Sequence, residues 1–183
     1  MKVNELLRLV RHQLNDPQGQ EFKDDELIDY INFAITFISQ ICIEHSYSGL
    51  LKSVVLTSEN GEFEIPSDFV KEEVVYDVDK GQGLSSGQYS IIGNAILAPN
   101  SKRIRLIYYS QFPLVSSIED NLPVPYWLTN ILASMVIVYA LNRVNVNTSF
   151  EFSFMADFRR QIEKICSEFS NSNIELSLPF RIN

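Results

Sequence analysis

The spacing of apolar residues changes twice along this chain, and that double change constrains the fold more than any other feature. Residues 1–48 repeat apolar side chains at helical spacing, residues 49–113 alternate with the two-residue period of strands, and helical spacing returns in residues 114–171. A helical period does not suit a strand, nor a strand period a helix. The sequence therefore predicts helical and β structure in separate parts of one chain of 183 residues.

Four helices are predicted, and the second is the most apolar around its circumference. A helix that is apolar over so wide an arc must be covered on more than one side, either at a bundle centre or by another subunit. Its aromatic residues are candidates for a subunit interface, and Trp127, at a helix start, suits either a core or an interface. The helices cover Val3–Leu14, Asp24–Glu44, Tyr126–Arg143 and Ser149–Phe169, and the candidate interface residues are Tyr30, Phe33, Phe37 and Trp127.

Six short strands are predicted in the middle of the chain. Asn60-Gly61 and Gly93-Asn94 are typical hairpin turns, and residues 81–88 are expected to form a loop. Strands this short and this close together favour a small antiparallel barrel or sandwich. The strands cover Ser53–Thr57, Glu62–Ile65, Glu73–Asp79, Tyr89–Ile92, Ala95–Ala98 and Arg103–Ser110.

The predicted fold class is α+β. Residues 1–48 and 114–171 are expected to form an antiparallel bundle of four helices, with an antiparallel β domain, residues 49–113, inserted between the second and third. Residues 172–183 are expected to form an extended C-terminal arm. In that arm apolar and other residues alternate as in a strand with one buried face. The apolar residues are Ile174, Leu176, Leu178, Phe180 and Ile182. Packing of the arm on its own β domain and simple disorder are the alternatives.

The charge balance argues against a general nucleic-acid surface. The chain has 15 Lys and Arg against 23 Asp and Glu, a net charge of −8, whereas non-specific binding to phosphates requires an excess of cations. The one basic cluster near aromatic residues is formed by Lys102, Arg103 and Arg105, close to Tyr108 and Tyr109. It leaves nucleic-acid binding open as an alternative.

The sequence contains no recognisable catalytic or metal-binding motif. His12 and His45 are isolated, so neither a metal site nor a cofactor is expected. Glu72 and Glu73 could act as paired carboxylates in a hydrolase, but an enzyme is not the expected function. The two cysteines, Cys42 and Cys166, are expected to be buried thiols in a reducing compartment.

No membrane segment or export signal is expected. The most apolar stretch, Ile131–Leu141, is about half the roughly 20 residues that cross a bilayer, and charges interrupt the N-terminal residues.

Several stretches resemble the tail adaptor proteins of short-tailed phages, which join head to tail below the portal. The sequence Tyr30-Ile-Asn-Phe-Ala34, preceded by Phe22 and Asp25-Glu-Leu-Ile28, is similar to the second helix of that family. Gly61–Phe69, with Pro66-Ser-Asp68, resembles their hairpin exit. Tyr108–Pro113 and Leu122-Pro123 resemble their closing strand and the entry to their third helix. The resemblance covers roughly residues 2–170.

The resemblance implies a structural role in the virion, which assembles in the host cytoplasm. Members of this family form a ring, usually of twelve subunits, between the portal and the next tail component, a nozzle or tail tube, and DNA passes through its lumen. The resemblance also implies a C-terminal arm that reaches up the portal. Our hypothesis from the alternation in residues 174–183 is that this arm docks on the portal, with Phe180 and Ile182 as anchors and Arg181 paired with a portal carboxylate. Some family members are credited with cell-wall hydrolysis, which leaves a peptidoglycan hydrolase as a further alternative.

Overall fold

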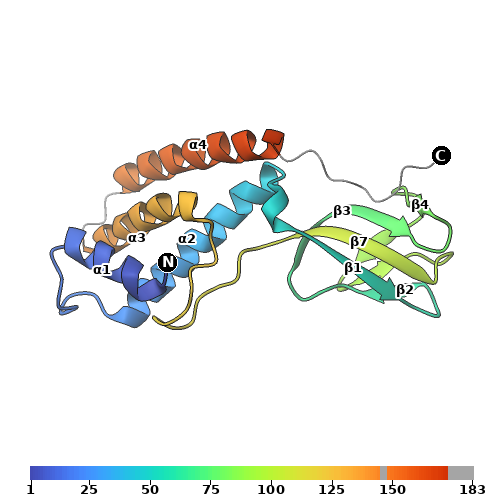
Figure 1. Ribbon diagram of the computed structural model, residues 1–183, viewed down its shortest axis with the longest axis horizontal. Helices are drawn as coiled ribbons and strands as arrows, with labels where there is room; N and C mark the ends of the chain where they lie inside the picture. Colours follow the sequence, from blue (N-terminus) through green and yellow to red (C-terminus); the bar gives the residue numbers. More distant parts are fainter. Residues whose placement is uncertain (145–147, 173–183) are drawn as a thin grey trace. The chain divides into compact units, whose positions relative to one another are not determined.

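The computed structural model describes residues 1–144 and 148–172 of the chain (Figure 1). The chain divides into two compact units. Among the described residues, 1–47 and those from 112 onward belong to a helical unit, and residues 48–111 form a β unit.

The helical unit is built around α3. Helix α3 packs against each of the other three helices, and α2 also packs against α4. The shortest helix, α1, buries Val3, Leu6, Leu7 and Val10. The bounds are Val3–Gln13 for α1, Asp24–Glu44 for α2, Thr129–Val144 for α3 and Thr148–Ser172 for α4, with a 3₁₀ turn, Tyr126–Leu128, before α3. The sequence therefore predicted the positions of the four helices within a few residues.

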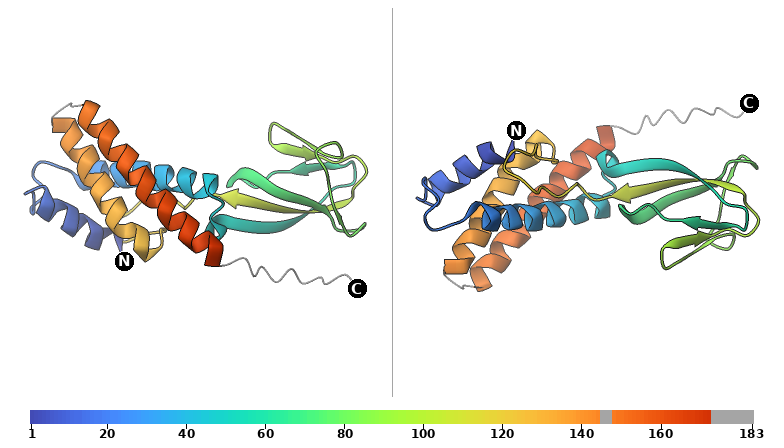
Figure 2. Two further views of the ribbon diagram at one scale, coloured as in Figure 1. Left: turned by 90° about the horizontal axis from the view of Figure 1, so that it is seen from above. Right: turned by 90° about the horizontal axis from the view of Figure 1, so that it is seen from below.

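The predicted fold class, a four-helix bundle with an inserted β domain, is wrong. Figure 2 shows α3 and α4 side by side, with α2 crossing them obliquely instead of lying nearly parallel as in a bundle. The physical reason is that residues 112–124, which form neither helix nor strand, pack along one side of α2. That side is therefore not available to another helix. We call residues 112–124 the strap.

Polar residues of α2 hold the strap. The Asn32 amide accepts a hydrogen bond from the Val115 N–H and donates one to its carbonyl, both at 2.9 Å. The buried Ser39 hydroxyl accepts a hydrogen bond from the Phe112 N–H at 3.1 Å. Further along the strap, the carbonyls of Asp120 and Ile118 accept the N–H groups of the first turn of α1. The strap thus satisfies backbone donors that a helix start leaves open.

Helix α2 ends in a left-handed residue that is not glycine. Ser46 has φ of 54°, and the Tyr47 N–H donates to the Cys42 carbonyl at 2.8 Å, while the Ser46 N–H donates to Ile43. These bonds define a Schellman motif, which favours glycine at the left-handed position. Asn15 ends α1 in the same way with φ of 57°.

We expect Ser46→Gly to raise the free energy of unfolding by about 1 kcal/mol, because glycine removes the steric cost of the left-handed conformation. Asn15→Gly should raise it less, since asparagine tolerates this region better than serine. Urea unfolding followed by circular dichroism measures both. A loss of stability in the Ser46 variant would contradict the assignment.

The β unit contains two antiparallel sheets. The larger has the strand order β1-β7-β3-β4 and the smaller β2-β6-β5. Side chains of both sheets form one core, with Phe63 and Ile96 from the small sheet and Val75, Ile104 and Leu106 from the large one. The unit is therefore a sandwich and not a barrel. The strands are β1 Leu51–Thr57, β2 Glu62–Glu64, β3 Phe69–Asp77, β4 Gln82–Gly83, β5 Ser90–Ile92, β6 Ala95–Leu97 and β7 Arg103–Ser110.

One of the two predicted hairpins is wrong. Gly93-Asn94 joins the paired strands β5 and β6, as expected. Asn60-Gly61 instead connects β1 to β2, which belong to different sheets. Of these two residues only Gly61 has a positive φ, 79°, and a Cβ there would lie 2.7 Å from the Cα of Pro99. Close backbone approach, and not a hairpin, therefore requires this glycine. The expected loop at 81–88 also contains a short strand, β4.

Helix α2 contributes much of the helical core. By length and composition alone this helix could cross a membrane. However, half of its most apolar 18-residue stretch is buried within the described structure. Leu27, Ile31, Ala34, Ile35 and Ile38 are fully buried. We therefore assign it to the core of the helical unit.

The two cysteines are buried, as predicted, and they face each other. Sγ of Cys42 on α2 lies 3.4 Å from Sγ of Cys166 on α4. This hydrogen bond, together with burial, raises the pKa of the Cys42 thiol. We expect both thiols to react with a thiol reagent on the order of 10²-fold more slowly in the native protein than in urea, because the reactive species is an exposed thiolate. Equal rates would contradict the burial.

Candidate docking surface

The outer face of the four-stranded sheet is the strongest candidate for a functional surface. The core-facing residues of β7 are Ile104, Leu106 and Tyr108, so the residues between them point to the opposite face. Arg105 and Ile107 occupy that outer face. The strand register places Arg105 between Val55 and Tyr76, and Ile107 between Ser53 and Val74.

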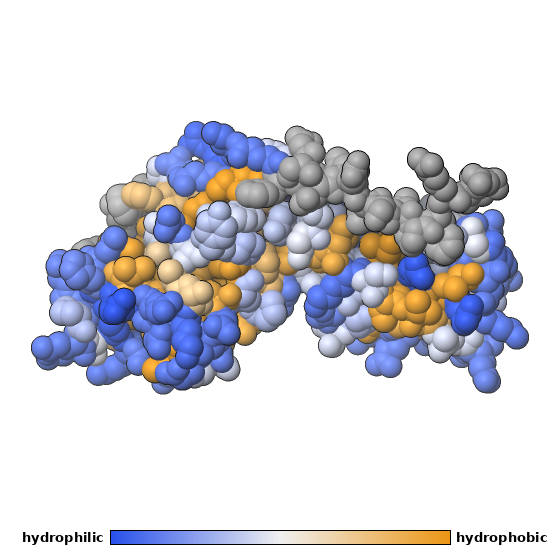
Figure 3. Space-filling view, viewed as in Figure 1, coloured by the Kyte–Doolittle hydropathy of each residue, from blue (hydrophilic) through white to orange (hydrophobic). Residues whose placement is uncertain are grey.

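This outer face is apolar and open. Val55 is 49% exposed and Val74 40% exposed, while Ile107 and Tyr76 are half-buried. Figure 3 shows the resulting apolar area over the large sheet, edged by hydrophilic residues. An apolar patch with a polar rim is typical of protein–protein interaction sites. We call these residues, together with Arg103 and Arg105, the sheet patch.

Arg105 is the unusual member of the sheet patch. The residue is half-buried, yet its guanidinium has no ion pair or hydrogen bond among residues 1–144 and 148–172. The neighbouring Arg103, also on the outer face, has Nε 2.9 Å from Oδ1 of Asp79. Lys102 is exposed. The structure thus places two of the three basic residues noted in the sequence on one face and leaves one guanidinium available.

The predicted interface residues of α2 lie on the surface of the helical unit. Phe33 is 61% exposed. The Tyr139 ring on α3 lies 6.4 Å from the Phe33 ring and 6.2 Å from the Tyr30 ring. The Tyr30 hydroxyl donates to Glu26 at 2.8 Å, and Phe37 is half-buried. Tyr30, Phe33 and Tyr139 therefore form one surface cluster.

Trp127 lies in the 3₁₀ turn that precedes α3. It is half-buried and packs edge-on against Tyr47, with 5.6 Å between ring centroids. Its neighbour Tyr126 is 88% exposed. The sequence reasoning selected Trp127 and passed over Tyr126, although an aromatic residue directly after Pro125 at a helix start carries the same signal.

The residues predicted to form a portal-binding arm lie outside the described residues. They are Ile174, Leu176, Leu178, Phe180, Arg181 and Ile182.

The candidate catalytic carboxylates lie at an irregularity in β3. Glu72 and Glu73 are consecutive on β3, at a bulge, with Glu72 half-buried and Glu73 exposed. Glycosidases need two carboxylates on either side of one substrate bond. Glu73 is the extra residue of the bulge, since Glu72 pairs with Tyr108 and Val74 with Ile107.

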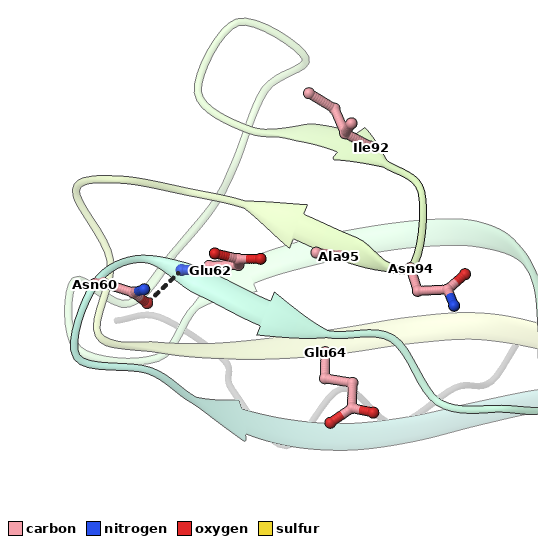
Figure 4. A pocket seen from close by; sticks show the side chains of 6 residues that line it. All are labelled: Asn60, Glu62, Glu64, Ile92, Asn94 and Ala95. Atoms are coloured by element: carbon pink, nitrogen blue, oxygen red, sulfur yellow. Dashed lines mark hydrogen bonds between the residues drawn. The ribbon is translucent and has the colours of Figure 1, made fainter.

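A shallow hollow on the small sheet contains another carboxylate pair that sequence reasoning missed. Glu62 and Glu64 lie two residues apart on the exposed face of β2, and both line the hollow (Figure 4). The hollow has a volume of about 470 Å³. The Glu-Phe-Glu alternation around the buried Phe63 was the available signal. The Glu62 N–H donates to Oδ1 of Asn60 at 3.1 Å, and the remaining lining residues are Ile92, Asn94 and Ala95.

Two further carboxylates are buried and have structural roles. Asp77 accepts hydrogen bonds from the Ser101 hydroxyl and from the N–H groups of Asp79 and Lys80, and the Lys80 ammonium lies 3.1 Å away. The bond from Ser101, followed by those from Lys80, lowers the pKa of Asp77 to about 2. Asp77 is therefore ionised at neutral pH, and its carboxylate stabilises the turn after β3.

Asp16 plays the corresponding part in the loop between α1 and α2. Its carboxylate accepts the N–H groups of Gln20 at 2.7 Å, Phe22 at 3.0 Å and Glu21 at 3.3 Å. The Phe22 hydrogen bond is the largest cause that lowers the pKa of Asp16. Arg11 completes the cluster by donating to Asp16, to the Phe22 carbonyl and to Asp24.

Within the described part of the chain, no group of three or more His, Cys, Asp or Glu residues could hold a metal ion. His12 is exposed on α1, and Nε2 of His45 lies 3.5 Å from Glu163.

Comparison with known proteins gives no identification. No protein-family profile matches this chain, and no curated protein sequence matches it.

Proposed function

We propose that this protein is a non-enzymatic structural subunit of a phage virion, a tail adaptor that forms a ring between the portal and the next tail component. The observation that carries the proposal is the sheet patch, an open apolar face with a guanidinium that has no partner among the described residues. Burial of such a face by a partner protein would be favourable, and arginine with aromatic neighbours is a common interface anchor. In this role DNA passes through the lumen of the ring.

The residues that resemble the adaptor family have defined places in the structure. Leu27, Ile31 and Ala34 are core residues of α2, Asn32 holds the strap, and Asp68 accepts a hydrogen bond from Tyr108 at 2.9 Å. The residues that carry the resemblance thus have structural roles in this chain, and the function remains our proposal.

The portal-binding part of the proposal concerns residues 174–183. A chain that ends at Asn173 should keep its melting temperature and lose binding to the portal of the same virus. The melting temperature is followed by circular dichroism and binding by size-exclusion chromatography with light scattering. Unfolding of the shortened chain, or portal binding equal to that of the full chain, would contradict an arm that docks on the portal.

Nucleic-acid binding is a second candidate, because Arg103, Arg105 and Tyr76 share one exposed sheet face. The net charge of −8 and the Arg103–Asp79 ion pair weigh against it. Titration of duplex DNA at several salt concentrations tests it. Micromolar or tighter binding that weakens with salt would favour this candidate over a protein partner.

Peptidoglycan hydrolysis is tested separately by a zymogram on cell-wall substrate. We expect no lysis. Lysis that is abolished by Glu73→Gln would overturn the non-enzymatic assignment.

A further inference from the structure

We infer that the sheet patch docks on helix α2 of a second copy of this chain. The inference deepens the proposed ring and rests on it, since it names the two surfaces that would join neighbouring subunits. Two different surfaces in contact make a heterologous interface, which is the kind that can close into a ring.

The first argument is charge complementarity. On α2, Asp25 and Asp29 are exposed, and neither forms a hydrogen bond or ion pair within the described ranges. They point from the same side of the helix as Phe33, because residues four apart lie one above the other. Arg103 and Arg105 supply the opposite charge on the sheet patch, and of these Arg105 lacks a partner among the described residues.

The second argument is spacing. Residues two apart on a strand are about 6.8 Å apart along it, so Arg103, Arg105 and Ile107 form a row with roughly that step. Residues four apart on a helix are about 6 Å apart along its axis, so Asp25, Asp29 and Phe33 form a row with nearly the same step. When α2 lies along β7, Asp25 meets Arg103, Asp29 meets Arg105, and Phe33 meets Ile107.

The third argument is the apolar end of each row. Phe33 is 61% exposed, and Val55 and Val74, which flank the β7 row, are 49% and 40% exposed. Docking would remove these side chains from water, which is favourable. The apolar contact therefore supplies affinity, while the two charge pairs set the register and the direction of the helix.

Charge reversal tests the interface. We expect Arg105→Asp and Asp29→Arg each to weaken self-association at least about tenfold, because each places like charges together. The double variant carrying both changes should recover most of the wild-type association, since the pair is then restored with opposite sign. Arg8→Asp and Glu59→Arg are matched controls, because each alters the charge equally at an exposed residue outside both rows.

Self-association is measured by sedimentation of the purified chain over a range of concentrations, and again as subunits bound per portal ring. Loss in both single variants with recovery in the double variant supports the interface. Single variants that behave like the controls, no recovery in the double variant, or a wild-type chain that does not self-associate in either assay would overturn it. Failure of the proposed function is distinguishable, because the chain would then bind no portal while its self-association still followed the charge pattern.

Discussion

Replacement of Asp77 by asparagine should lower the free energy of unfolding of the β unit by about 3 kcal/mol. Asp77 is fully buried and is the common acceptor for Ser101, for two backbone N–H groups and for the Lys80 ammonium. Removal of one partner of a buried ionic network leaves the others unsatisfied, which is strongly destabilising. Asparagine also turns an amide N–H₂ group towards these donors.

The control for this variant is Asp79→Asn, two residues along the same turn. Asp79 and its partner Arg103 are both about half exposed, and exposed ion pairs contribute about 1 kcal/mol or less. The free energy of unfolding of both variants is measured by urea unfolding, and the local stability of β3 and β7 by amide hydrogen exchange. Equal losses would show that Asp77 is not the centre of the network.

The same carboxylate predicts a pH dependence. The pKa of Asp77 is about 2 in the folded protein against an ordinary value of 3.8, so the unfolded chain binds the proton more tightly. The stabilisation is therefore complete above about pH 4 and is lost as the pH falls from about 4 to 2, with a total of about 2 kcal/mol. Asp77→Asn should flatten this part of the stability profile.

Replacement of Asp16 by asparagine should have the largest effect on the helical unit. Three backbone N–H groups and the Arg11 guanidinium converge on this buried carboxylate. Its loss releases the loop that positions Phe22, whose ring lies 5.6 Å below the Arg143 guanidinium. We expect the melting temperature to fall by roughly 8 °C, as for other disrupted buried networks.

Asp24→Asn provides the matched control, because Asp24 is exposed and bonds the same arginine. Its melting temperature should fall by roughly 2 °C or less. A similar fall in melting temperature in both variants would contradict this account, because it would show that the bonds of Arg11, and not the backbone hydrogen bonds to Asp16, stabilise the loop.

Local structure was largely predictable from the sequence, whereas long-range packing was not. The four helices and the alternation on β7, with Ile104, Leu106 and Tyr108 inward, follow from residues that are close in the chain. The pairing of β1 with β7, and of β2 with β6, joins segments far apart in sequence. A turn signal such as Asn60-Gly61 fixes a local bend but not the partner of the next strand.

The same distinction applies to the candidate surface. The Arg-x-Arg-x-Ile alternation on β7 was visible in the sequence, but the neighbours Val55 and Tyr76 come from other strands. The strap was also missed, because Asn32 and Ser39 were indistinguishable from solvent-facing residues of α2 until Val115 and Phe112 were placed against them. This packing against the strap is the reason why the predicted four-helix bundle is wrong.

The most direct test of the proposed function is the mass of the complex between this protein and the portal of the same virus, measured by native mass spectrometry. The proposed adaptor role predicts that the chain alone is monomeric or weakly associated. It also predicts that addition of the portal ring gives one closed species with a fixed number of copies, usually twelve in the family that it resembles. A mixture that contains only free portal and free chain would contradict the adaptor role, and so would a stable ring that forms without the portal.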